Sequence, residues 1–159
     1  MKKTEKKREN EAGVPFWEST PLSGMSRKQW ESLCDGCGLC CMEKLEDADT
    51  GVVYVTSVAC QYLDLESCRC RIYENRTYIN DVCVELTPGS VSQYSWLPET
   101  CAYRRVLAGK PLPPWHPLLC GSAKKMKKAG ATACDRAISG ESIHPDDLHR
   151  FIDYEVPSE

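Results

Sequence analysis

The sequence CDGCGLCC, residues 34–41, places four cysteines within eight residues. Two thiolates separated as C-x-x-C can face one metal ion while the chain turns between them, and here the spacing continues as C-x-x-C-x-x-C-C. Gly36 and Gly38 permit positive φ angles, which a loop wrapped around an ion often needs. Core packing does not explain so dense a cluster. The stretch, called the cysteine loop below, therefore predicts a metal-binding site.

The adjacent pair Cys40 and Cys41 bears on how many ions are bound. In an extended chain, neighbouring side chains point to opposite sides, so these two thiols need not serve the same ion. One can bind a first centre while the other binds a second centre or packs in the core. By the same rule Cys68 and Cys70 point to one side if extended and can share a centre.

The whole chain holds eleven cysteines in 159 residues, an odd number that disulfides cannot pair completely. Such a count indicates either a disulfide framework in a secreted protein or metal ligation inside the cell. The N-terminus, MKKTEKKRENEAG, is not followed by the run of about 7–15 apolar residues of a secretory signal. No stretch approaches the ~20 apolar residues of a membrane span. We therefore expect a cytoplasmic protein with reduced thiols, metal ligation and no membrane association.

Counting the cysteines limits the kinds of metal centre. A closed structural zinc site takes four ligands, so the cysteines between residues 34 and 101 suffice for two mononuclear sites or one polynuclear cluster. The ferredoxin pattern C-x2-C-x2-C-x3-C-P matches only the first three cysteines of the loop, which keeps an iron–sulfur cluster as an alternative. The expected cofactor is zinc or iron. The nine candidate metal ligands are Cys34, Cys37, Cys40, Cys41, Cys60, Cys68, Cys70, Cys83 and Cys101.

Other residues have weaker signals for a role at the centre. His116 lies in a proline-rich segment that favours a structural role over metal ligation, and Asp35 suits a turn. Cys120 and Cys134 are expected to be ordinary buried or half-buried residues. Cationic side chains can neutralise a thiolate-rich centre, because four thiolates around Zn²⁺ leave a net charge of −2. The candidates for this are Arg71, Arg76 and Arg104.

Three helices are predicted. The first spans Ser26–Leu33, where Ser26 and Gln29 form a capping box. The second spans Pro98–Leu107, before the stop signal Gly109. The third spans Pro145–Tyr154, since proline suits the first helical position.

The remaining segments indicate one small domain. Residues 1–13 are charged and without apolar periodicity, so we expect a disordered tail followed by one domain over 14–159. The segment 52–58 (VVYVTSV) predicts a strand, and 68–73 a second short extended piece. The segment 111–117 (PLPPWHP) excludes a regular helix or a central strand and is expected to wrap over the surface of the core. The predicted fold is a small, irregular α+β domain with short helices, few short strands and metal as a staple.

Several motifs together resemble one known family. The loop CDGCGLCC is followed by Cys60, by CRIYENR at 70–76 and by Cys83, an arrangement similar to that of the YkgJ/YcgN-type cysteine-cluster proteins. Further phrases resemble the YcgN branch and extend the resemblance over residues 14 to about 122. These phrases are PFW (15–17), WESLCDGCG (30–38), WLP (96–98), TCAYR (100–104) and WHPLL (115–119).

The resemblance implies a zinc- or iron-chelating domain. Cys68 and Cys101 correspond to features of the YcgN branch. Many family members have Arg-Pro after the Cys-x-Ile-Tyr motif, whereas Arg76 is followed here by Thr77, which puts the course of the turn toward Cys83 in doubt. The ligands implied to be shared with the whole family are Cys34, Cys37, Cys40, Cys41, Cys60, Cys70 and Cys83.

Three classes of function follow from these observations. The first is a metal-binding protein that uses zinc or iron structurally, and the second is an iron–sulfur protein of redox or electron-transfer function. The third is an enzyme, but the chain has no G-x-S-x-G elbow, no P-loop and no G-x-G-x-x-G. A net charge of −3 argues against nucleic acid as a partner, because phosphate binding needs a basic face. The expected partner is a metal ion, and a protein partner is left open.

Overall fold

A helix and a hydrogen-bonded turn bring the chain to the cysteine loop. The computed structural model describes residues 13–157, so the predicted tail over 1–13 lies outside the described residues except for Gly13. Helix α2 (Arg27–Leu33) begins with the predicted capping box: the backbone N–H of Gln29 donates to Ser26 Oγ, and the backbone N–H of Ser26 donates to Gln29 Oε1. Leu33, the last residue of α2, is fully buried. This anchor fixes where the loop starts.

The larger hydrophobic core lies among the short helices α1 (Phe16–Ser19), α2 and α4 (Ala102–Leu107). Helices this short are not stable alone in water, so tertiary packing holds them. The Tyr103 hydroxyl donates to the Trp30 carbonyl at 2.9 Å, which ties α4 to α2. The 3-10 turns Leu22–Gly24 and Val91–Gln93 border this core. Its buried residues are Phe16, Trp17, Leu22, Leu33, Val91, Leu97, Ala102, Tyr103 and Leu112.

A small sheet forms the other half of the fold. Strand β1 (Met42–Glu46) pairs antiparallel with β2 (Val53–Ala59), which matches the strand predicted over 52–58. On its other side β2 pairs antiparallel with β6 (Ile152–Glu155) and, near its end, parallel with β5 (Ile138–Ser139). A second core packs on this sheet from Met42, Val55, Ala59, Leu63, Cys68, Ala133 and Cys134.

Short elements carry the chain between sheet and helices. Strands β3 (Leu63–Asp64) and β4 (Arg69–Cys70) form a small hairpin, followed by a 3-10 turn at Tyr73–Asn75 and by α3 (Arg76–Ile79). Beyond α4 the chain forms α5 (Pro117–Cys120), α6 (Lys124–Lys128) and a 3-10 turn at Gly140–Ser142.

Two predicted elements differ from the structure. The helix expected over Pro145–Tyr154 is wrong at its end, because only Pro145–Phe151 is helical, as 3-10 helix, and Ile152 starts β6. Pairing with the free edge of β2, in the register Val55 with Tyr154, satisfies backbone groups that a terminal helix would leave to solvent. The helix expected over Pro98–Leu107 begins later, at Ala102.

The proline-rich segment 111–117 is more deeply packed than expected. Leu112 is buried in the larger core, and His116 is completely inaccessible to solvent. The backbone N–H of Leu118 donates to His116 Nδ1, so His116 Nε2 carries the proton and donates to the Leu33 carbonyl at 2.9 Å. Both ring nitrogens are engaged, which gives His116 the structural role expected of it and fixes the residue before Cys34.

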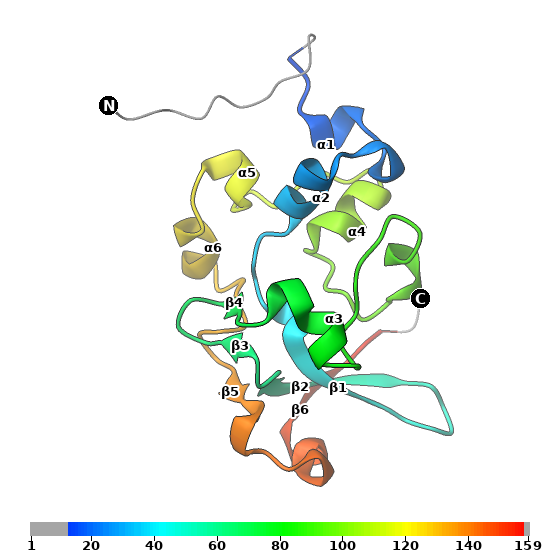
Figure 1. Ribbon diagram of the computed structural model, residues 1–159, viewed down its shortest axis with the longest axis vertical. Helices are drawn as coiled ribbons and strands as arrows, with labels where there is room; N and C mark the ends of the chain where they lie inside the picture. Colours follow the sequence, from blue (N-terminus) through cyan, green and yellow to red (C-terminus); the bar gives the residue numbers. More distant parts are fainter. Residues whose placement is uncertain (1–12, 158–159) are drawn as a thin grey trace.

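Figure 1 shows where the cysteine loop lies between the helices and the sheet. Helices α1, α2 and α4 gather at one end of the molecule, and β1, β2 and β6 lie at the other. The loop, drawn in light blue, runs between α2 and β1 and so joins the two halves. No helix within residues 13–157 is long and apolar enough to cross a membrane.

Candidate metal centre

Local backbone geometry shapes the cysteine loop. The Asp35 carboxylate accepts a hydrogen bond from the backbone N–H of Cys37 at 3.0 Å, which forms the expected turn. Gly38 has a φ of 73°, and the 3-10 turn Leu39–Cys41 follows it. The Cys41 carbonyl accepts from the backbone N–H of Cys60 at 2.8 Å, so the loop is fastened to the end of β2.

Four of the candidate ligands form what we call the first sulfur group: Cys34, Cys37, Cys40 and Cys101. Burial raises the pKa of Cys34 to about 12, and the charges of Cys40 and Cys101 add to this. Burial is also the largest cause of the raised pKa of Cys37, followed by the charge of Asp35 and, later, of Cys40. Burial raises the pKa of Cys101, again with a contribution from Cys40. Cys40 therefore acts on each of these three thiols, and its charge also raises the pKa of Cys83.

Four others form the second sulfur group: Cys41, Cys60, Cys70 and Cys83. The pKa of Cys41 is raised most by its hydrogen bond to Cys40, then by burial and by the charges of Cys40, Cys60 and Cys70. Burial raises the pKa of Cys60, with a contribution from the charge of Cys70. Burial raises the pKa of Cys83, and the charges of Cys70 and Cys60 act in the same direction. These sulfurs come from the end of the cysteine loop, the residue after β2, the strand β4 and the segment after α3, and they lie close enough to influence one another's pKa.

Cys40 and Cys41 connect the two groups. The thiol of Cys41 donates to the sulfur of Cys40, and this hydrogen bond is the largest cause of a lowered Cys40 pKa of about 7. The charge of Lys44 also lowers it. Lys44 Nζ is held nearby, donating to the Cys40 carbonyl at 3.0 Å and lying 4.3 Å from the centre of the Trp96 ring. Both the hydrogen bond from Cys41 and the charge of Lys44 therefore favour the thiolate form of Cys40.

The donor set fits a soft metal. Both groups consist entirely of thiols, and all eight are free of disulfides. Thiolate ligands favour zinc and iron over hard cations such as Mg²⁺ and Ca²⁺. Within residues 13–157, no three Cys, His, Asp or Glu side chains are placed so that they could hold a metal ion, so metal binding by either group would require the sulfurs to move closer together.

A pocket gives access to the first sulfur group. Cys34 and Cys40 line a cavity of about 430 Å³ whose walls include Trp30, Trp96 and Tyr103. The two cysteines are exposed at this concave surface while protein surrounds them, which explains how burial still raises the pKa of Cys34. The other six thiols of the two groups are only partly exposed. Small molecules therefore reach the first group more easily than the second.

The ninth candidate, Cys68, belongs to neither sulfur group. It forms a disulfide with Cys134, so its sulfur is already bonded and is separate from both sulfur groups. This pairing differs from the expectation that all thiols are reduced and that Cys134 is an ordinary buried residue. Cys120 also lies apart, and its thiol donates to the carbonyls of Trp115 and Ser122.

Two polar residues beside the sulfurs were missed by sequence reasoning. Lys44 lies in β1, four residues after Cys40. Its side chain reaches back to the Cys40 carbonyl, a contact that only the structure shows. Asn80 donates through Nδ2 to Cys60 Sγ at 3.6 Å, a contact with no signal in the sequence. Of the three arginines expected near the centre, Arg76 lowers the pKa of Cys83, against the larger effect of burial.

The two glycines of the loop offer a matched pair of substitutions. Gly36 and Gly38 both have positive φ, but a Cβ on Gly36 would meet nothing within 4 Å. A Cβ on Gly38 would lie 2.9 Å from Cys68 Sγ and 3.3 Å from Cys134 Sγ. We expect Gly36→Ala to cost about 1 kcal/mol through its backbone alone. Gly38→Ala adds overpacking and should cost about 2–4 kcal/mol.

Chemical denaturation of the two variants measures this difference. Equal losses of unfolding free energy in Gly36→Ala and Gly38→Ala would show that the disulfide does not pack against the loop.

Comparison with known proteins places this site in a wider group. Residues 33–102, which contain all eight thiols of the two sulfur groups, match the family model CxxCxxCC, described as "Putative zinc- or iron-chelating domain". A UPF0260 protein of Pseudomonas putida F1 is 47% identical over 134 residues, or 84% of this chain and 90% of the relative. UPF0260 proteins of Azotobacter vinelandii and Rhizobium johnstonii are 47% and 49% identical, each over 87% of this chain and over 93% and 88% of the relative. No solved structure matches the chain.

Proposed function

The chain belongs to the UPF0260 family, and we propose that it is a metal-binding protein that holds zinc or iron in two separate four-thiolate centres. One centre uses the first sulfur group and the other uses the second. A metal-chelating role agrees with the description of the domain that its cysteine-rich segment matches. The division into two centres goes beyond that description and rests on the arrangement of the sulfurs.

The observation that carries the proposal is the way the eight thiols divide. Cys34, Cys37 and Cys101 each interact with Cys40, whereas Cys41 interacts with Cys60 and Cys70. Cys40 also interacts with Cys41 and Cys83, which places it between the two groups. We assign one sulfur of the adjacent pair Cys40 and Cys41, which lie in the 3-10 turn Leu39–Cys41, to each group. Each group then has the four ligands that a closed structural site requires.

The residues around the sulfurs suit negatively charged centres. A divalent ion with four thiolates carries a net charge of −2, which nearby cations and hydrogen-bond donors stabilise. Lys44 supplies a positive charge beside Cys40, and Arg76 supplies one beside Cys83. Asn80 donates to Cys60. One bound ion would link the ends of α2 and α4 to the cysteine loop, and the other would link this loop to the end of β2 and to β4.

The iron–sulfur alternative gains no specific support from the described residues. The same holds for an enzyme, although the pocket beside Cys34 and Cys40 gives ligands a route to the first group. We propose the cytoplasm as the location, because free thiolates persist in reducing compartments.

Titration of the metal-free protein with cobalt(II) tests the proposal. Cobalt bound by four thiolates has intense visible absorption, so we expect this absorption to rise until two cobalt ions are bound per chain and then to stop. Bound metal should also protect eight of the nine free thiols from alkylation, whereas Cys120 should remain reactive in the metal-loaded protein. Weak absorption typical of oxygen ligands, or no protection of the thiols, would exclude the proposed centres.

A further inference from the structure

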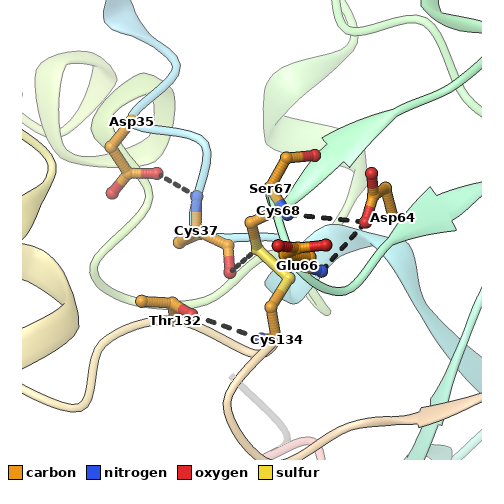
Figure 2. The surroundings of a disulfide bond; sticks show 8 residues. All are labelled: Asp35, Cys37, Asp64, Glu66, Ser67, Cys68, Thr132 and Cys134. Carbon is orange, nitrogen blue, oxygen red and sulfur yellow. Dashed lines mark hydrogen bonds between the residues drawn. A yellow bond between two sulfur atoms is a disulfide. The ribbon is translucent and has the colours of Figure 1, made fainter.

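The disulfide between Cys68 and Cys134 lies directly against the cysteine loop (Figure 2). Cys68 Sγ is 3.7 Å from the carbonyl oxygen of Cys37, and the backbone N–H of Ala133 donates to the same oxygen at 2.8 Å. Cys68 and the residue before Cys134 therefore contact one peptide group of the loop. That peptide group joins Cys37 to Gly38, between two members of the first sulfur group.

Gly38 fits against the two sulfur atoms of the disulfide. Its backbone approaches so closely that even a methyl group would lie 2.9 Å from Cys68 Sγ. Gly38 is buried, and its φ of 73° is readily adopted by glycine. The disulfide thus forms the surface on which this turn of the loop rests.

Cys68 is also held in an unusual local conformation. Its φ is 56°, the only positive value among the non-glycine residues 13–157, and such values concentrate at functional sites. Asp64 maintains the turn, because its carbonyl accepts from the backbone N–H of Cys68 and its carboxylate accepts from that of Glu66. Two residues later, Cys70 belongs to the second sulfur group. The disulfide thus contacts the loop that carries the first group, and Cys68 lies two residues before a member of the second group in the sequence.

From these contacts we propose that Cys68–Cys134 is a reversible thiol–disulfide site that clamps the cysteine loop and slows metal release. This inference rests on the proposed function. In the oxidised form the disulfide supports the Cys37–Gly38 turn and joins it to the segment containing Ala133. When the disulfide is reduced, two separate thiols replace a rigid cross-link between residues 66 apart in sequence, and the support becomes mobile.

A dithiol is the chemical class of reductant that this site would take. One thiolate of the dithiol attacks a sulfur of the disulfide, and the second thiolate then resolves the mixed disulfide. The S–S bond of the protein breaks, Cys68 and Cys134 each gain a proton, and the two electrons come from the dithiol, which becomes a disulfide. Glu66 and Ser67 are exposed beside Cys68, so opening of this turn gives the reductant a path to the buried sulfur.

The test measures metal release from the loaded protein with and without a phosphine reductant. A phosphine does not compete as a thiol ligand, and it takes up the oxygen of one water molecule while the disulfide gains two hydrogens. A chromophoric chelator then reports the rate of release. We expect reduction to accelerate release about tenfold or more, with the number of bound metals unchanged before the chelator is added.

Two variants serve as controls. The double variant Cys68→Ala/Cys134→Ala should release metal as fast as the reduced wild type and should not respond to phosphine. Cys120→Ala lacks a thiol outside the disulfide and should respond like the wild type. Circular dichroism establishes that each variant is folded, and the wild-type comparison needs no substitution.

Three results would overturn the clamp. These are an absence of the disulfide in protein purified without reductant, a release rate unaffected by phosphine, or reduction that adds a metal or slows release. The last result would make Cys68 and Cys134 ligands. Failure of the proposed function has a different signature, because the protein would then bind no metal before any reductant is added.

Discussion

Removal of the bound metal is expected to unfold the sheet half of the protein. Binding to a site that does not persist in the unfolded chain contributes its free energy to folding, about 10–16 kcal/mol for structural zinc in small domains. The whole stability of a domain is about 5–15 kcal/mol. The apolar core on the sheet is small, and many of its contacts come from short or irregular segments such as those holding Leu63 and Ala133. In the sheet half of the protein, metal binding is therefore expected to contribute more to the free energy of unfolding than apolar packing does.

Thermal denaturation of metal-loaded and chelator-treated protein measures this effect. We expect the loaded protein to melt in one transition at high temperature, and the treated protein to have lost its β-sheet circular dichroism before heating. The aromatic core around α2 and α4 is larger, so fluorescence of Trp17 and Trp30 should keep a part of its native signal. An unchanged melting temperature after complete metal removal would mean that metal bound by the sulfurs does not stabilise the fold.

Single cysteine substitutions should remove one metal each. Cys101→Ser deletes one ligand of the first sulfur group, and Cys83→Ser deletes one of the second. A site reduced from four thiolates to three loses affinity by several orders of magnitude, while the other group keeps its own four ligands. We therefore expect each variant to bind one metal per chain and the double variant to bind none.

Metal content by elemental analysis, after gel filtration, distinguishes the outcomes. Cys120→Ser is the matched control, because this thiol is hydrogen-bonded to the Trp115 carbonyl and belongs to neither group, so two metals should remain. Loss of both metals from either single variant would indicate one polynuclear centre shared by all eight thiols. Loss of a metal from Cys120→Ser would contradict the assignment of the groups.

Local signals in the sequence were sufficient for the elements nearest the site. The capping box of Ser26 and Gln29 predicted α2, and the β-branched run at 52–58 predicted β2, since both depend on neighbours in the chain. The C-terminal segment was mispredicted because Ile152 is recruited to the edge of β2, a partner about a hundred residues away. Such long-range pairing leaves little trace in a local pattern.

At the candidate site, too, features that depend on nearby residues were predicted and long-range contacts were not. The cysteine spacing and the resemblance to a cysteine-cluster family named the candidate thiols, and the adjacent pair Cys40 and Cys41 left one centre or two centres open. The pairing of Cys68 with Cys134 had no signal, because spacing along the chain does not reveal which cysteines meet across a fold. Lys44 was missed for a related reason, since its approach to the loop depends on the turn into β1.

Metal and acid-labile sulfide analysis of untagged protein, purified without oxygen or added chelator, tests the central claim most directly. The two-centre account predicts two zinc or iron ions per chain, no acid-labile sulfide and eight thiols protected from alkylation. Iron with stoichiometric acid-labile sulfide would replace the mononuclear centres with an iron–sulfur cluster. Protein free of metal, with the cysteines of the two sulfur groups joined in disulfides, would contradict the account.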